Sequence, residues 1–256
     1  MIITDTHMHI IPNVDDGSPS LEESIRMLRM SAEQGVGSVI ATPHSWGIEH
    51  YGIEYVLSRF EQLKKAVTAR KIPIHLYLGC EMLVKMKNDP SWMYLDDMSF
   101  PYKDTVDDCI RKLDNCSYPT MAGTRHVLTE FDEQEREENM GPCIRKLVCA
   151  GYVPVIAHVE RYRSITMAGI RELKACGAKI QINAYSIANE KRDKTRQLAN
   201  DCLYEKLVDF IGSDAHRLKH RPPVIADGID AMIQLYTEEY ARKVLEDNPR
   251  DLLLYA

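Results

Sequence analysis

An α/β fold, built from strand–helix units around a parallel sheet, is predicted by three features of the sequence. Seven apolar, strand-like runs are spread along the 256 residues, segments of helical spacing lie between them, and most runs end in a histidine or an acid. Alternating strands and helices are typical of parallel sheets. Ligand-type side chains at the carboxyl ends of successive strands are what a barrel needs to build a site for several metal ions.

The seven runs share short length and a polar end. They are Ile2–Ile3, Val36–Thr42, Ile72–Leu78, Arg125–Thr129, Val153–Ala157, Ala178–Ile182 and Phe210–Ile211. Six lead into histidine, aspartate or glutamate, and only Ala178–Ile182 leads into an amide, Asn183. Six independent packing coincidences are a poor explanation of this pattern, so we expect one shared metal site.

Apolar residues at helical spacing predict the helices between these runs. In the first, Ser20 and Glu23 are expected to form a capping box, and Gly35 ends the helix. Further helices are predicted over residues 53–71, 105–113, 133–149, 167–176, 190–207 and 225–245.

The chain length permits one large α/β barrel or two smaller domains. No interdomain linker or low-complexity stretch interrupts the sequence, so a single domain over residues 1–256 is expected. Residues 82–126 exceed the length that one strand–helix unit needs. They are interpreted as an elaborated connection over one end of the barrel.

Composition argues against several classes of protein. A net charge of -6 gives no general attraction to nucleic acid or anionic lipid. No apolar stretch approaches the roughly 20 residues that span a membrane, and the N-terminus does not resemble a signal peptide. Seven cysteines, none spaced as Cys-x-x-Cys, favour reduced thiols and a cytoplasmic location.

Candidate ligands begin with His7 and His9. Two residues apart on an extended strand, both rings project from the same face. Asp15 and Asp16 follow in a loop that can fold back towards them, and His44 follows a strand-breaking proline. Taken singly, these residues also fit ordinary structural roles. The two histidines could be a chance pair on a surface strand, His44 could cap or pack, and the acids could be solvated.

Glu81 and Glu130 follow apolar strand residues. Because an unpaired carboxylate there would carry a large desolvation cost, a cation is expected nearby. Imidazole and carboxylate together suit Mn, Fe or Zn. The remaining four histidines are expected to be non-ligands. His75 and His126 lie too far down their strands from the carboxyl ends, and His50 and His220 lie in loops where no spacing argument applies.

Together these motifs resemble the PHP (polymerase and histidinol phosphatase) family, and more closely its branch of bacterial metal-dependent protein-tyrosine phosphatases, found with capsule and exopolysaccharide tyrosine kinases. The motifs are Asp5-Thr6-His7-Met8-His9, Asp15-Asp16-Gly17, Thr42-Pro43-His44, Gly79-Cys80-Glu81, Thr129-Glu130-Phe131, His158-Val159-Glu160-Arg161, Ser213-Asp214-Ala215-His216 and Arg221-Pro222-Pro223. They run through residues 5–223, so the resemblance covers nearly the whole chain.

The resemblance implies a distorted (β/α)7 barrel of PHP type with three divalent ions, Mn being expected and Fe or Zn the alternatives. It assigns His7, His9, Glu81 and Asp214 to one ion; Glu81, Glu130 and His158 to a second; and Asp16, His44 and His216 to the third. It also implies that Arg161 and Arg221 contact the substrate phosphate. Val159 stands where this branch usually has proline, and residues 82–126 are longer than usual.

The function that the resemblance implies is hydrolysis of phosphotyrosine on a protein, with the C-terminal tail of a bacterial tyrosine kinase as the expected substrate. A metal-bound hydroxide is the expected nucleophile. A thiol-based phosphatase is rejected because it needs arginine six residues after cysteine, and none of the seven cysteines has one.

Two alternatives remain at this point. One is a small-molecule phosphatase of the same family, such as one for histidinol phosphate. The other is a non-catalytic metal-binding module serving regulation, for which Val159 and the long 82–126 segment are the motives.

Overall fold

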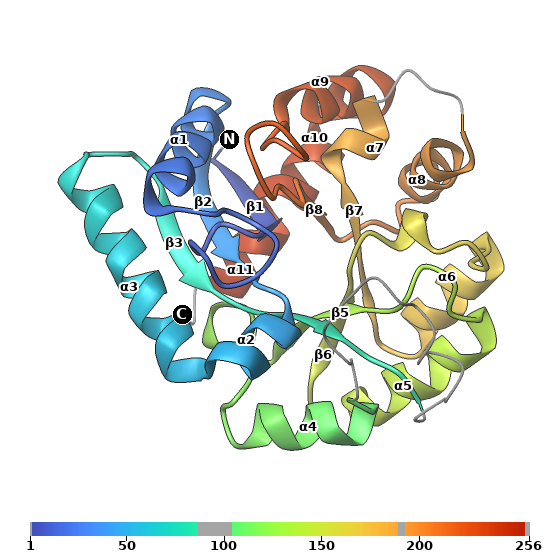
Figure 1. Cartoon of the computed structure of the whole chain (residues 1–256). Helices are drawn as coiled ribbons and strands as arrows, with labels where there is room; N and C mark the ends of the chain where they lie inside the picture. The colour runs from blue at the N-terminus through green and yellow to red at the C-terminus, as the bar shows by residue number, and fades with distance from the viewer. Residues whose placement is uncertain (1, 87–103, 189–192, 254–256) are drawn as a thin grey trace.

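Eight strands in the described part of the chain form two parallel sheets (Figure 1). The computed structural model describes residues 2–86, 104–188 and 193–253. One sheet has the order β1 (Ile3–Met8), β2 (Val36–Ala41), β3 (His75–Leu78). The other has the order β4 (Glu81–Leu83), β5 (His126–Glu130), β6 (Val153–Ile156), β7 (Lys179–Asn183), β8 (Phe210–Gly212). Neighbouring strands pair in parallel, which confirms the predicted α/β class.

Backbone bridges link the two sheets at both edges. Only Gly79 and Cys80 separate β3 from β4, and a parallel bridge pairs His44 with Glu81. At the other edge β1 contacts β8, and a second bridge pairs Met8 with Ala215. Because parallel neighbours end at the same edge of a sheet, the side chains that follow these strands are brought towards one another.

Helices accompany the strands, and most of them lie around the outside (Figure 1). They are α1 (Leu21–Glu33), α2 (Ser45–Tyr51), α3 (Ile53–Ala69), α4 (Val106–Asp114), α5 (Glu137–Cys149), α6 (Met167–Ala175), α7 (Ala184–Ala188), α8 (Lys194–Tyr204), α9 (Ala226–Leu235), α10 (Glu238–Arg242) and α11 (Asn248–Leu253). Short turns of helix follow some strands and helices, namely η2 (Met121–Gly123), η3 (Val159–Arg161) and η4 (Lys243–Asp247).

Strand β1 extends through the polar motif that was expected to follow it. Thr6 Oγ1 donates to the carbonyl of Ile211 at 3.0 Å, and Asp5 Oδ1 accepts from the backbone N–H of Ser213 at 2.9 Å. Buried polar groups are tolerated when they are hydrogen-bonded. These bonds to the end of β8 therefore let the strand run on to Met8.

The capping box predicted at the start of α1 forms only in part. Ser20 Oγ accepts from the backbone N–H of Glu23, but the Glu23 carboxylate accepts from the backbone N–H of Leu218. A complete box caps α4, where Thr105 and Asp108 bond reciprocally. The Glu23 side chain thus ties α1 to the loop after β8.

Several helix boundaries differ from prediction. The single helix expected over 225–245 breaks at Tyr236, whose φ of -122° and ψ of -103° are not helical. The helix expected from residue 133 begins at Glu137, because the preceding residues turn past the end of β5. The short helices α2 and α7 were not predicted. Residues 190–192 of the expected 190–207 helix lie outside the described residues, and α8 begins at Lys194 with Asp193 as its cap.

A hydrophobic cluster gathers side chains from several strands. Ile40 of β2, Leu128 of β5, Val155 of β6 and Phe210 of β8 are buried together with Leu252 of α11. A larger core packs the helices against the outside of the strands, and Leu63 of α3 is fully buried in it. The site at the strand ends is therefore supported by packed apolar layers.

The predicted elaborated connection is described only at its ends. It contains β4, α4 and η2, while residues 87–103 lie outside the described residues. Across the described ranges, no helix combines the length and the apolar character that crossing a bilayer requires.

Replacing Leu63 by alanine should lower the free energy of unfolding by about 2–5 kcal/mol, because the fully buried side chain would leave a cavity. Leu57 on the same helix is 43% exposed and supplies a matched control. Leu57→Ala should change the free energy of unfolding by less than about 0.5 kcal/mol. Urea unfolding of both variants measures the difference, and equal losses would contradict this packing of α3.

Candidate metal centre

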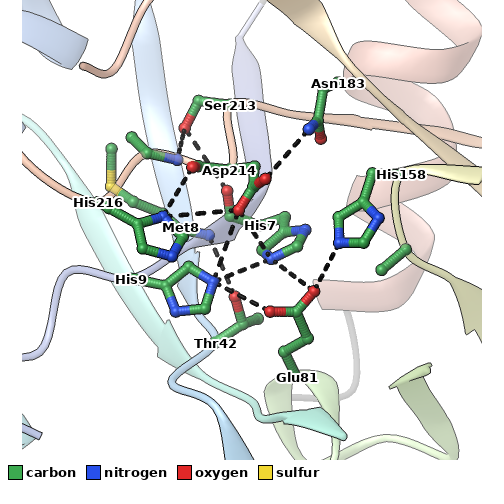
Figure 2. Close-up of polar contacts among 12 residues, drawn as sticks. His7, Met8, His9, Thr42, Glu81, His158, Asn183, Ser213, Asp214 and His216 are labelled. Atoms are coloured by element: carbon green, nitrogen blue, oxygen red, sulfur yellow. Dashed lines mark hydrogen bonds and ion pairs between the residues drawn. The ribbon is translucent and has the colours of Figure 1, made fainter. Parts of the chain in front are cut away.

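The nine predicted ligand residues converge at the carboxyl ends of the strands. Figure 2 shows six of them, His7, His9, Glu81, His158, Asp214 and His216. Among the described residues, three groups of side chains have potential ligand atoms within 4.8 Å of one another. The groups are His7, His9 and Asp214; His44, Glu81 and Glu130; and His9, Asp16, His44 and His216. His158 adjoins the second group. The groups overlap, so the residues form one continuous centre.

Asp214 and Glu81 approach the imidazoles of His7 and His9 from two sides. Asp214 Oδ1 lies 3.5 Å from His7 Nε2 and 3.6 Å from His9 Nε2. Glu81 Oε1 lies 3.2 Å from His7 Nε2, and its Oε2 lies 3.1 Å from His9 Nε2. His7 lies in β1 and His9 directly follows that strand, their Nε2 atoms are 3.1 Å apart, and all four side chains are almost completely buried.

Glu81 also reaches a second set of side chains. Its Oε1 is 3.0 Å from His158 Nε2, and its Oε2 is 3.1 Å from His44 Nδ1. Glu130 adds its two oxygens at 3.4 Å from His158 Nε2 and 3.7 Å from His44 Nδ1. The Glu81 carboxylate, a member of the second group, thus also contacts both histidines of the first.

Asp16 completes the third group at the exposed rim. Its Oδ1 is 3.6 Å from both His44 Nε2 and His216 Nε2. The Asp16 side chain is 54% exposed, whereas His216 is buried. This group is therefore the one most open to solvent.

Three histidines share an arrangement that suits a cation. Nδ1 of His9 donates to Asp15 Oδ2 at 2.7 Å, Nδ1 of His216 donates to the Asp214 carbonyl at 2.9 Å, and Nδ1 of His7 lies 3.3 Å from Gln181 Oε1. The opposite nitrogen, Nε2, turns into the cluster in each case. Metal-binding histidines are typically held in this way, with one nitrogen donating to the protein and the other facing the ion.

Hydrogen bonding leaves atoms of the cluster unsatisfied. Within the described part of the chain, His216 Nε2 and His44 Nδ1 are buried without a hydrogen-bond partner. Burial and the neighbouring His9 lower the pKa of His216 to about 2, so this imidazole is neutral. A neutral, buried nitrogen facing carboxylates is the form that binds a metal. The donor set therefore fits divalent ions.

Electrostatics keep the central carboxylates ionised. Burial by itself would raise the pKa of Glu81, but electrostatic interactions with the imidazoles of His7 and His44 hold it well below its usual range. Burial likewise opposes ionisation of Asp214, and electrostatic interactions with the imidazoles of His7 and His158 lower its pKa. Burial disfavours the charged His158, yet Glu130 and Glu81 raise its pKa to about 10. The carboxylates are thus charged and ready to bind cations.

Asp15, which the sequence analysis named beside Asp16 but assigned to no ion, orients two histidines. Its Oδ2 accepts from His9 Nδ1 and, at 2.9 Å, from the backbone N–H of His44. Its Oδ1 accepts from the backbone N–H of Gly17, where a Cβ would lie 2.3 Å from the His9 carbonyl oxygen. The adjacent acids therefore have different tasks, since Asp15 faces inward and Asp16 faces the third group.

Arg161 and Arg221 converge on one oxygen of Asp214. Nη1 of each guanidinium lies 3.1 Å from Asp214 Oδ2. Arg161 Nη2 also pairs with Glu133 Oε1 at 2.5 Å. Val159, in the position that raised a question about this loop, is buried, and Arg161 still reaches the cluster.

A cavity of about 200 Å³ opens over this centre. It is lined by His44, Glu81, Leu83, Glu130, Phe131, Asp132, Glu133, His158, Arg161, Asp214 and Arg221. Carboxylates, imidazoles and both arginines thus share one pocket with two apolar side chains.

The four histidines expected to be non-ligands are absent from the described clusters. His75 and His126 begin β3 and β5, at the opposite ends of these strands from the centre. His50 lies near the end of α2, and His220 is exposed in the loop after β8.

Comparison with known families identifies one model that matches most of the chain. The model describes capsular polysaccharide synthesis, CpsB/CapC, and matches residues 3–91 and 102–254. These two stretches contain all nine candidate ligands and both arginines.

Curated relatives match the chain over nearly their whole length. Tyrosine-protein phosphatase CpsB of Streptococcus agalactiae serotype III is 28% identical over 257 residues, covering 97% of each chain. Tyrosine-protein phosphatase YwqE of Bacillus subtilis is 28% identical over 220 residues, covering 85% of this chain and 78% of that protein.

Solved structures with a similar fold cover nearly the whole chain. A crystal structure from work on YwqE of Bacillus subtilis and CpsB of Streptococcus pneumoniae, described as unique metal-dependent tyrosine phosphatases, matches with a TM-score of 0.80 and 25% identity, covering 98% of this chain and 94% of that chain. A phosphotriesterase from Mycobacterium tuberculosis matches with a TM-score of 0.58 at 14% identity, covering 98% of this chain and 93% of that chain. At that identity the second likeness concerns the fold alone.

Replacing Asp15 by asparagine should weaken Mn²⁺ binding by about 10- to 100-fold, because the charged acceptor that orients His9 would be lost. Isothermal titration with Mn²⁺ measures the change. Asp193→Asn is the matched control, since aspartate and asparagine cap a helix equally well and Asp193 caps α8, which supplies none of the candidate ligands. Unchanged Mn²⁺ affinity in Asp15→Asn would contradict the orienting role.

Proposed function

The chain belongs to the capsular polysaccharide synthesis CpsB/CapC family, and we propose that it is a metal-dependent phosphotyrosine-protein phosphatase. The observation that carries this proposal is the shared cavity, in which buried carboxylates and imidazoles lie beside two arginines. Relatives named tyrosine-protein phosphatase, similar over almost the full chain, support the same activity.

We propose further that the two sheets form one distorted (β/α)7 barrel and that residues 1–256 are a single domain. With β3 and β4 almost continuous, the eight strands occupy seven positions. The contact of β1 with β8 and the apolar cluster shared by β2, β5, β6 and β8 support closure. The likeness to phosphotriesterase-type structures is consistent with this arrangement.

Three divalent ions are proposed to occupy the centre. His7, His9, Glu81 and Asp214 would hold the first; Glu81, Glu130 and His158 the second; and Asp16, His44 and His216 the third. The positions of Glu81 between two groups and of Asp16 beside His44 and His216 support this division. Nitrogen and oxygen donors without thiolate suit Mn, with Fe or Zn as alternatives.

Bound divalent ions would lower the pKa of a water molecule towards about 7 and offset phosphate charge. Arg161 and Arg221 are proposed to bind the phosphoryl oxygens. Their guanidinium groups line the cavity, and each keeps further N–H groups beyond the one near Asp214 Oδ2. Paired N–H donors match a phosphate geometrically.

The apolar lining suits an aromatic leaving group. Leu83 and Phe131 contribute the apolar walls of the cavity among its polar residues. Apolar walls with a few placed polar groups are typical of ligand pockets. A tyrosyl oxygen, with a pKa of about 10, leaves with little help from an acid, unlike a seryl or sugar alkoxide.

The substrate is proposed to be the phosphotyrosyl C-terminal tail of a bacterial tyrosine kinase of capsule or exopolysaccharide synthesis. The family description, capsular polysaccharide synthesis, supports this choice. An extended tail presents its phosphotyrosine without the rest of a folded domain, which suits a pocket of about 200 Å³.

Glu81→Gln should lower the hydrolysis of a phosphotyrosyl peptide by at least about 100-fold, because Glu81 contacts four of the candidate ligand histidines. Initial rates with Mn²⁺ supplied measure the loss, and circular dichroism checks the fold. Glu61→Gln on the exposed face of α3 is the control. Activity that survives in Glu81→Gln, or that a chelator does not abolish, would refute the metal-dependent mechanism.

Histidinol phosphate in the same assay tests the small-molecule alternative. We expect kcat/KM to be higher for the phosphotyrosyl peptide. A preference for histidinol phosphate would overturn the proposed substrate class, and absence of any chelator-sensitive phosphate release would favour a non-catalytic metal-binding module.

Arg161→Lys should lower kcat/KM for the peptide by about 10- to 100-fold, because lysine keeps the charge but lacks the paired donors. Inorganic phosphate should also become a weaker inhibitor. Arg171→Lys, at an exposed pair with Glu205, is the control. An unchanged inhibition constant for phosphate would show that Arg161 does not bind the phosphoryl group.

A further inference from the structure

Strand β7 provides none of the nine candidate ligands, yet two of its side chains contact them. We propose that Gln181 and Asn183 are positioning residues, Gln181 for the His7 imidazole and Asn183 for the Asp214 carboxylate. The inference rests on the ligand roles proposed above. Figure 2 shows Asn183 reaching Asp214 from the side opposite Glu81.

Gln181 is fully buried, and its amide has one possible orientation. Its Nε2 donates to the Ile182 carbonyl at 2.6 Å and to Asn183 Oδ1 at 3.1 Å. Because these two partners are acceptors, the oxygen of the amide must point the other way. Gln181 Oε1 there accepts from the backbone N–H of His158 at 2.8 Å and lies 3.3 Å from His7 Nδ1.

This orientation selects the protonation of His7. With an oxygen beside Nδ1, the proton of the neutral ring is held on Nδ1, and the lone pair is left on Nε2. His7 Nε2 is the atom that faces Glu81 and Asp214. Gln181 therefore presents the correct nitrogen of His7 to a cation, and it also fixes the backbone at His158.

The orientation of Asn183 follows from that of Gln181. Since Asn183 Oδ1 accepts from Gln181, its Nδ2 is directed to Asp214 Oδ2, at 3.1 Å. The backbone N–H of Asn183 donates to Glu160 Oε1 at 2.9 Å, and this buried carboxylate also accepts from Ser186 Oγ at 2.7 Å. The asparagine is thus held at both its backbone and its side chain.

The two oxygens of Asp214 have different partners, and Asn183 is one of the partners of Oδ2. Oδ2 accepts from Asn183, Arg161 and Arg221, each at 3.1 Å. Oδ1 is left to the imidazoles, 3.5 Å from His7 Nε2 and 3.6 Å from His9 Nε2. Asn183 is the neutral donor of the three. It would still hold Oδ2 if the arginines turned to a phosphate.

Two substitutions of Asn183 separate positioning from packing. Asn183→Asp keeps the size of the side chain but replaces the donor by an oxygen that repels Asp214 Oδ2. Asn183→Ala removes volume and adds no repulsion. If Asn183 positions Asp214, the aspartate variant should bind Mn²⁺ more weakly than the alanine variant, and both should bind it more weakly than the parent, by about 10- to 100-fold. A packing role predicts the reverse order.

Gln181→Met tests the other half of the pair at nearly constant volume. We expect Mn²⁺ affinity to fall by about 10- to 100-fold, measured by isothermal titration on the full chain. Asn200 lies on α8, where its side chain bonds the backbone of Arg196 and the hydroxyl of Tyr236 and contacts no candidate ligand. Asn200→Ala should therefore leave Mn²⁺ affinity within about twofold of the parent. Thermal unfolding of the metal-free proteins checks that each variant is folded.

Folded Gln181→Met and Asn183→Asp variants with parental Mn²⁺ affinity would overturn the inference. Because the readout is metal binding, it does not depend on peptide turnover. If the parent protein had no phosphotyrosine activity, the proposed function would be refuted. A loss of Mn²⁺ affinity in the variants relative to that parent would still support the positioning roles.

Discussion

Two buried carboxylates, Glu81 and Asp214, impose the constraint on which the arrangement of the site depends. Each is almost inaccessible to water and each is ionised, a combination that is costly unless opposite charge or hydrogen-bond donors surround the group. The structure meets this demand with imidazoles from β1 and the loops after β2 and β6, and with two arginines. Cations at the same place would meet it more fully.

Asp214 connects the two halves of the proposed chemistry. Through Oδ1 it faces the histidines, and through Oδ2 it accepts from the arginines proposed to bind phosphate. A phosphate that draws Arg161 and Arg221 away would remove two donors from Oδ2. Glu133 holds Arg161 from its other side, so that the guanidinium lies between a buried and a half-exposed acid. The geometry of the arginines and that of the metal ligands are therefore coupled.

Much of this centre could be predicted from the sequence, because parallel strands bring their carboxyl ends together whatever the details of the helices. The two-residue spacing of His7 and His9 and the place of Glu81 after an apolar run made them candidates, and the family resemblance assigned them to ions. Other parts depend on contacts between distant segments. The different tasks of Asp15 and Asp16 are set by the backbone of His44, and the role of Asn183 is set by Asp214, 31 residues away. The break at Tyr236 likewise interrupts a stretch whose apolar spacing continues.

Manganese anomalous diffraction from crystals grown with Mn²⁺ and inorganic phosphate would test the central claim most directly. We expect three anomalous peaks among the nine residues, one of them adjoining Asp214 Oδ1, and a phosphate contacted by Arg161 and Arg221. Peaks elsewhere on the protein, or a centre without manganese whose carboxylates remain paired only with histidines and arginines, would contradict a metal-dependent phosphatase built on this cluster.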